Sequence, residues 1–256
     1  MLIISMVLLC IFSSTMFFLE VIQKQQDEMN FETLRDQVED QNEKNEEYIT
    51  QEVEQNSLGV PKQPPQILEQ YKGIIQINEE LAGWIKIDNT NIDYPVMHTP
   101  NDEEYYLYRN FEKEYSSSGT PFLSASNTLE SENEQIVIYG HNMKNGTMFN
   151  DLLLYKDQVF WQENPYVYFD TLYSEDIYEI FAVFEIDVEI ENGHFPFYQH
   201  VNFKSEKVFN DFLSEITELS LYETSITPSY GNNILTLVTC EDFSGSNRLV
   251  IMATKK

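Results

Sequence analysis

Basic residues are scarce in this 256-residue chain, because 15 lysines and arginines stand against 43 aspartates and glutamates, for a formal net charge of −28. Nucleic-acid binding draws on Lys and Arg to displace counterions, so this balance argues against nucleic acid as a partner. Only two cysteines are present, Cys10 and Cys240, which excludes a disulfide framework. The sequence also lacks CxxC pairs and the Cys/His clusters of ordinary zinc sites, and we expect neither a metal nor a cofactor.

Charge is missing altogether from Met1 to Leu19, where three serines and one threonine are the only interruptions of an apolar run. About 20 apolar residues cross a bilayer core, and Val21 and Ile22 extend this run past Glu20. A cleaved signal peptide, the alternative, normally has a basic start and a small-residue cleavage site, and neither is present. We therefore expect residues 1–22 to be an uncleaved single-pass membrane anchor, with the bulk of the chain outside the cell.

The stretch that follows is acidic and rich in Gln and Asn. Phe31, Leu34 and Val38 are spaced as on one helix face, but they are too few to pack a core. Residues 23–63 are therefore predicted to form a solvated stalk, helical in part or disordered, that holds the folded part off the membrane. A dimeric coiled coil is the less favoured alternative, because apolar heptads do not persist. The folded domain is predicted over residues 64–256, from the Pro64-Pro65 pair onward.

This domain is predicted to be mostly β, because short apolar runs alternate with turn signals, as in a barrel or sandwich. Asn101 to Glu104 resembles a helix start with a capping Asn. A stripe of apolar residues behind Ser205, a plausible N-cap, predicts one amphipathic helix over 205–219. One or two short helices are predicted over 66–81, and strands over 84–87, 92–97, 120–123, 135–139, 166–169, 177–190, 233–240 and 248–253.

Cys240 ends one of these apolar runs and precedes a polar loop. A cysteine at the mouth of a strand is held rigidly yet can meet solvent, as a reactive thiol must. Free cysteine is also a common small core residue, so the position alone leaves both readings open. His141 follows another strand end and Gly140, and an imidazole near a thiol can take its proton or stabilise the thiolate.

Arg248 begins the last predicted strand, eight residues after Cys240. A seven-residue loop between strands 234–240 and 248–254 could bring its guanidinium near the sulfur. A fixed cation there would favour the thiolate and stabilise an oxyanion formed during acyl transfer. The alternative role is a salt bridge to one of the many carboxylates.

Together these segments resemble sortases, the cell-wall transpeptidases of Gram-positive bacteria. The resemblance rests on Tyr139-Gly140-His141-Asn142-Met143, Thr236 to Glu241, and Asn247 to Ile251. Gly83 to Ile87, Ile92 to Val96, Tyr105-Tyr106-Leu107 and the helix at 205–219 are similar to the class B subgroup. The match covers residues 66–256 with the motifs in order.

The resemblance implies a closed β-barrel of about eight strands with N-terminal helices and one inserted amphipathic helix. Its groove would bind the C-terminal sorting peptide of a secreted surface protein. Cys240 would attack the carbonyl of a Thr–Gly-like or Thr–Asn-like bond, His141 would be the acid/base partner, and Arg248 would stabilise the oxyanion and orient the peptide. An amine of the peptidoglycan cross-bridge or of its lipid-linked precursor would then resolve the thioester.

The same resemblance implies weaker substrate-binding roles for Asn127, Tyr139, Thr239 and Glu241. The ordinary alternatives are that Asn127 is a turn residue, that Tyr139 and Thr239 pack within their strands, and that Glu241 is a solvated charge in a loop. Related enzymes often have an Asp–Tyr–Arg–Asn-like run where this chain has Ser124-Ala125-Ser126-Asn127, which leaves the peptide preference open. The calcium site of some class A members has no evident counterpart.

Three other functions are weighed against this one. A papain-like hydrolase would place its cysteine before its histidine, and this chain has the reverse order. A non-catalytic surface-binding module would be favoured by replacement of one of the three catalytic residues, and all three are present. A pilin-polymerising sortase would use a protein lysine as acceptor, and the sequence does not distinguish it from a cell-wall sortase.

Overall fold

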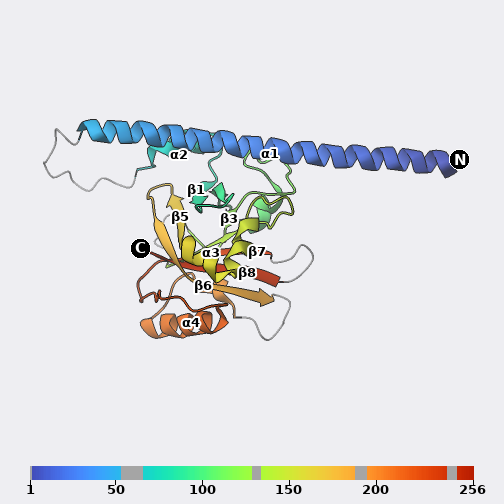
Figure 1. Cartoon of the computed structure of the whole chain (residues 1–256). Coiled ribbons are helices and arrows are strands. Elements are labelled where there is room, and N and C mark those ends of the chain that lie inside the picture. Colours follow the sequence, from blue (N-terminus) through green and yellow to red (C-terminus); the bar gives the residue numbers. More distant parts are fainter. Residues whose placement is uncertain (1, 53–65, 129–133, 188–194, 241–246) are drawn as a thin grey trace.

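The computed structural model describes residues 2–52, 66–128, 134–187, 195–240 and 247–256. Within this part, eight strands close into a barrel in the order β1-β2-β3-β4-β7-β8-β6-β5, which confirms the predicted architecture (Figure 1). The strands are β1 Leu81–Lys86, β2 Asp93–Met97, β3 Phe122–Leu123, β4 Gln135–Tyr139, β5 Tyr166–Thr171, β6 Ile177–Asp187, β7 Ile234–Cys240 and β8 Asn247–Lys255. The helices are α1 Leu2–Glu52, α2 Glu69–Ile77, η1 Glu103–Tyr108, η2 Asn150–Lys156, α3 Gln158–Glu163, η3 Phe197–Gln199 and α4 Glu206–Leu219, of which those marked η are 3-10 helices.

Strand β7 is buried on both of its faces. Leu235 and Leu237 belong to the cluster that fills the barrel, whereas Ile234 and Val238 belong to a second cluster outside it. This alternation follows from the two-residue period of a strand. Strand β8 alternates in the same way, so the sheet separates two cores.

Helix α4 covers the second cluster, as its apolar stripe predicts. The Ser205 hydroxyl accepts a hydrogen bond from the Val208 amide at 3.4 Å, which confirms the predicted N-cap. Phe209, Phe212 and Ile216 are buried against the sheet. The helix predicted near Asn101 also forms, but as the 3-10 helix η1, and its N-cap Asp102 makes no side-chain capping bond.

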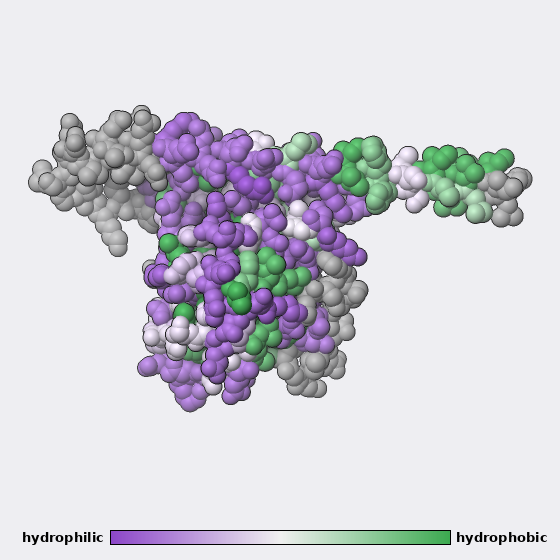
Figure 2. All heavy atoms as spheres, viewed as in Figure 1, coloured by the Kyte–Doolittle hydropathy of each residue, from purple (hydrophilic) through white to green (hydrophobic). Residues whose placement is uncertain are grey.

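Helix α1 is one continuous helix that runs along one end of the barrel and projects beyond it with its apolar N-terminal part (Figures 1 and 2). Phe31, Leu34 and Val38 are only 1%, 4% and 7% exposed. The prediction that these residues are too few to pack is therefore wrong, because the barrel supplies the other half of their surface. The Phe31 ring meets the edge of Tyr94, with ring centres 5.3 Å apart, and Arg35 Nε donates to the Asp93 carbonyl at 2.7 Å.

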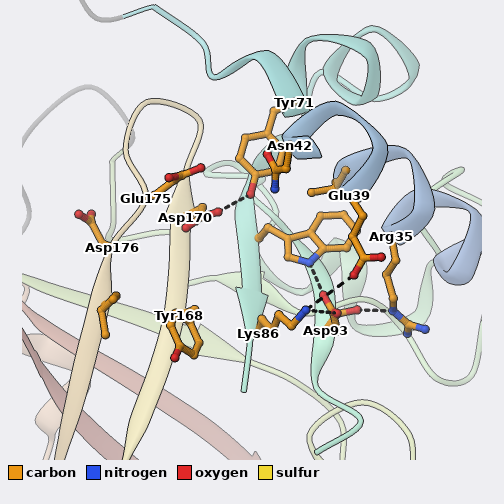
Figure 3. Close-up of a pocket in the computed structure, with 13 residues that line it drawn as sticks. Arg35, Glu39, Asn42, Tyr71, Lys86, Asp93, Tyr168, Asp170, Glu175 and Asp176 are labelled. Atoms are coloured by element: carbon orange, nitrogen blue, oxygen red, sulfur yellow. Dashed lines mark hydrogen bonds and ion pairs between the residues drawn. The ribbon is translucent and has the colours of Figure 1, made fainter. Parts of the chain in front are cut away.

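A polar pocket of about 410 Å³ lies where α1 and α2 meet the barrel (Figure 3). The Tyr71 hydroxyl of α2 donates to the Asp170 carboxylate of β5 at 2.7 Å, and Trp84 Nε1 donates to Asp93 at 2.6 Å. Burial raises the pKa of Asp170 to about 6, although the Tyr71 hydrogen bond acts in the opposite direction. The Tyr71 contact joins α2 to β5, whereas the Trp84 contact joins β1 to β2. Neither His141 nor Arg248 lines the pocket.

Candidate active site

The structure brings the ends of β4 and β7 side by side. The two strands pair in parallel with Tyr139 opposite Val238, and the Gly140 amide donates to the Val238 carbonyl at 3.1 Å. His141 and Cys240 each stand two residues further along. The Thr239 hydroxyl donates to the Gly140 carbonyl at 2.8 Å, which ties the two strand ends together. Two residues 99 positions apart in the sequence are thus placed at one mouth of the barrel.

Arg248 is the direct antiparallel partner of Cys240. The register of β7 and β8 ends on the pair Cys240 and Arg248, which confirms the predicted hairpin. Residues directly opposite each other in antiparallel strands share one face of the sheet. Arg248 Nη1 also donates to the Asn247 carbonyl at 3.1 Å, and its side chain lines the groove described below.

His141 is held by a backbone carbonyl that the sequence does not reveal. Its Nε2 lies 2.8 Å from the Leu107 carbonyl oxygen, and its ring centre lies 5.6 Å from that of Tyr108. A carbonyl oxygen can only accept, so Nε2 carries the proton of the neutral imidazole and Nδ1 is left as the basic nitrogen. Burial lowers the pKa of His141, and the hydrogen bond to Leu107 opposes part of that effect. The ring is therefore kept neutral near neutral pH.

A groove of about 510 Å³ begins at this mouth. Tyr139 and Val238 line it from the neighbouring strands, and Arg248 lines it from β8. Ser124 and Tyr198 add hydroxyl groups to its wall. The groove wall thus combines apolar strand surface with hydroxyls, one guanidinium and the carboxylate of Glu103. Such a wall suits an extended peptide, whose backbone needs hydrogen-bonding partners and whose side chains need apolar contact.

Of the other substrate-binding candidates, Asn127 and Thr239 are buried and bind backbone groups. Asn127 is 1% exposed, and its amide group binds the backbone of β4, donating to the Gln135 carbonyl at 2.7 Å and accepting from the Val137 amide at 2.9 Å. Thr239 is 2% exposed and serves the strand junction. The structure thus gives both residues a supporting position rather than a place on the groove wall. Glu241 lies outside the described residues.

A closed barrel with a cysteine, a histidine and an arginine at adjoining strand ends defines a class of protein, the β-barrel cysteine transpeptidases. Comparison with known proteins agrees. The family model described as "Sortase domain" matches residues 85–256. Sortase B of Listeria monocytogenes is 31% identical over 176 residues, which are 69% of this chain and 69% of the relative.

Solved structures give the same result. A sortase B from B. anthracis in complex with AAEK1 has a TM-score of 0.73 and 29% identity, covering 92% of this chain and 98% of its own. Clostridium perfringens sortase B has a TM-score of 0.65 and 33% identity, covering 72% of this chain and 98% of its own. The chain belongs to the sortase family, and it is a cysteine transpeptidase of the sortase B type.

Proposed function

We propose that this enzyme cleaves the C-terminal sorting motif of secreted surface proteins after a threonine and transfers the protein to a cell-wall amine. The observation that carries the proposal is the register of the sheet, which sets Cys240 opposite Arg248 and beside the strand that leads into His141. Acyl transfer by a thiol needs a nucleophile, a proton carrier and a group that stabilises negative charge, and these three residue types supply them.

The reaction proceeds in two steps. Nδ1 of neutral His141 takes the thiol proton of Cys240, the thiolate attacks the threonine carbonyl carbon, and His141 passes that proton to the leaving amine as the C–N bond breaks. The acceptor amine then attacks the thioester and gives a proton to His141 Nδ1 as the C–S bond breaks, and His141 returns this proton to the Cys240 sulfur. His141 is suited to both proton transfers because the Leu107 carbonyl holds Nε2 and leaves Nδ1 available.

Arg248 stabilises the oxyanion that forms on the threonine carbonyl in each step. Its place on the groove wall also lets the guanidinium bind backbone carbonyls of the peptide and orient them. Tyr139 lines the same groove and is the substrate-binding candidate that the geometry supports best.

The acceptor is an amine of the peptidoglycan cross-bridge or of its lipid-linked precursor, and the enzyme acts from the outer face of the membrane. The anchor is the N-terminal part of α1, the one helix in the described part of the chain that is long and apolar enough to cross a membrane. Its apolar side chains, such as Leu8, Phe12 and Phe17, are 62%, 65% and 69% exposed, as lipid contact requires (Figure 2).

Mass spectrometry of the full chain in detergent, incubated with a threonine-containing peptide library and amine acceptors, tests the proposal. We expect a thioester on the parent protein and none on Cys240→Ala. The matched control is Cys10→Ser, which removes the other cysteine and should acylate normally. Acylation of Cys240→Ala, or its loss in Cys10→Ser, would overturn the assignment. The same spectra report the scissile bond and the acceptor.

A further inference from the structure

Helix α1 places a buried carboxylate against the loop that follows η1, close to the segment that holds His141. Asp27 is 1% exposed, and its Oδ1 accepts from Asn110 Nδ2 at 3.0 Å and from Gln23 Nε2 at 3.1 Å. The other carboxylate oxygen has no hydrogen-bond partner among the described residues. Burying a carboxylate is costly unless it is well bonded, so this contact stabilises the fold less than an apolar one of equal size could.

The Asn110 side chain is the barrel's half of this contact. It is 1% exposed, and its Oδ1 accepts from the Glu114 backbone amide at 2.9 Å, while the backbone amide of Asn110 donates to the Glu114 carbonyl at 3.0 Å. The asparagine therefore closes a short loop and has one amide group left for Asp27. Because the Asn110 side chain is bonded to Asp27 through its nitrogen and to Glu114 through its oxygen, we expect a shift of Asp27 to move the backbone at Asn110.

The backbone just before Asn110 carries the carbonyl that binds His141. The carbonyls of Tyr106, Tyr108 and Arg109 each accept a hydrogen bond from the later segment: from the Thr120 amide at 3.0 Å, the Ser116 amide at 3.0 Å and the Thr120 hydroxyl at 2.9 Å. The Leu107 carbonyl is directed to His141.

Gly119 shows how closely this carbonyl is surrounded. The residue has a φ of +62°, and a Cβ added there would stand 2.5 Å from the Leu107 oxygen. Only glycine fits that position without moving the carbonyl. The segment is thus clamped by 116–120 on one side and by α1 on the other.

We propose that Asp27 is a positioning residue for catalysis: through Asn110 it fixes residues 106–110, so that the Leu107 carbonyl keeps His141 in the tautomer with the proton on Nε2 and with Nδ1 free for proton transfer. The inference rests on the proposed role of His141 as the acid/base partner. It gives α1 a part in the chemistry beyond that of an anchor.

The tautomer of His141 is the readout that a merely structural role would not move. The full chain has four histidines, so ¹⁵N-histidine labelling in detergent gives few signals, and His141→Gln identifies the one that matters. We expect neutral His141 in the parent to show one tautomer, protonated on Nε2. Asp27→Ala should show a mixture of both tautomers, whereas Asp27→Asn, which keeps an acceptor oxygen, should restore the single one.

Arg35→Ala is the matched control, because it also removes a hydrogen bond between α1 and the barrel but at the Asp93 carbonyl. It should lower stability without mixing the tautomers. Gly119→Ala is the positive control, because it moves the Leu107 carbonyl without touching α1 and should mix them.

Reactivity gives a second measurement. In a Cys10→Ser background, alkylation of Cys240 by iodoacetamide at neutral pH should slow about tenfold in Asp27→Ala, a fraction of what a positioned proton acceptor contributes. Arg35→Ala should react at the parent rate.

A single unchanged tautomer in Asp27→Ala, or equal mixing in Arg35→Ala, overturns the proposal, as does a parent protein protonated on Nδ1. If Asp27→Ala does not fold, Asp27→Leu removes the same hydrogen bond with a side chain of similar volume and leaves the Asn110 bond to Glu114 in place, and its spectrum is judged in the same way. Failure of the proposed function is a separate outcome, since it is signalled by His141→Gln acylating peptide at the parent rate whatever the tautomer.

Discussion

Arg248 lies directly opposite Cys240 in the antiparallel pair of β7 and β8, so the strand register places it on the same face of the sheet as the proposed nucleophile. At the scale of single residues the site is assembled by strand register and by main-chain groups, above all the Leu107 carbonyl. Asn127 and Thr239, which the sequence predicts as substrate contacts, instead bind the backbone of β4 and of Gly140.

Arg248→Lys should slow acylation roughly 10²-fold, the scale of losing one oxyanion donor, although the charge is kept. The planar fork of arginine offers two parallel donors, and a lysine ammonium does not reproduce them. Single-turnover acylation measures the rate. The control Arg35→Lys makes the same change on α1 and should leave it unaltered. An unimpaired Arg248→Lys enzyme would show that the arginine is purely structural.

Asp170→Asn should stabilise the protein above pH 7. The folded-state pKa of Asp170, about 6, exceeds its ordinary value of 3.8, so the folded state holds the proton more tightly than the unfolded state between these values. Stability contributed by this residue is therefore lost as pH rises through that window, by up to about 3 kcal/mol.

The substitution keeps an acceptor for the Tyr71 hydroxyl and removes the buried charge. Thermal melts should show a Tm gain of several degrees at pH 7.5 that disappears near pH 4. The exposed carboxylate of Asp211, replaced by Asn as a control, should give almost no change at either pH. A constant Tm difference across the range would contradict the explanation.

At the scale of elements, α1 and α4 differ in how far their packing can be predicted from the sequence. Helix α4 is predictable because its N-cap and its whole apolar stripe lie within 15 residues of sequence. The docking of α1 is not predictable in this way, because its partners lie far along the chain: Phe31 packs on Tyr94 of β2, Arg35 binds the Asp93 carbonyl 58 residues away, and α1 also contacts α2. The same holds for the candidate active site: sequence motifs predict His141, Cys240 and Arg248, but no sequence pattern predicts that the Leu107 carbonyl binds His141.

Phe31→Ala should therefore destabilise the whole barrel by about 3 kcal/mol, the cost of emptying a buried aromatic site. Met29→Ala is the matched control on the same helix, because its side chain is 51% exposed. Denaturant unfolding followed by tryptophan fluorescence reports both, since Trp84 lies in the barrel wall beside α1. Equal, small effects would mean that α1 behaves as a free stalk.

At the scale of the molecule, two cores share one sheet, and α1 extends one of them beyond the sortase domain that begins at residue 85. The N-terminal helix is thus both the proposed anchor and part of the folded unit. The boundary predicted at residue 64 stays a prediction, but the packing of Phe31 to Val38 shows that the core reaches well before it.

Removing residues 1–25 should give a soluble enzyme with nearly the parent Tm, because the apolar run is lost while the contacts of Asp27, Phe31, Leu34 and Val38 with the rest of the folded domain are kept; Asp27 loses only its hydrogen bond from Gln23. Removing residues 1–40 should also give soluble protein, but with a clearly lower Tm and slower acylation. Membrane fractionation, melts and acylation assays distinguish the two. If the shorter deletion stays with the membranes, the anchor assignment is wrong.

The continuity of α1 sets how far the enzyme can stand from its lipid bilayer. Ile22, the last residue of the proposed anchor, precedes Asp27 by five residues in an unbroken helix, and at 1.5 Å per residue that is roughly 8 Å. The barrel would then work at the height of the lipid headgroups. Under the proposed function, its encounters with substrates tethered in the same membrane would be a two-dimensional search, and substrates with a short spacer between the scissile threonine and their own hydrophobic tail would be within reach.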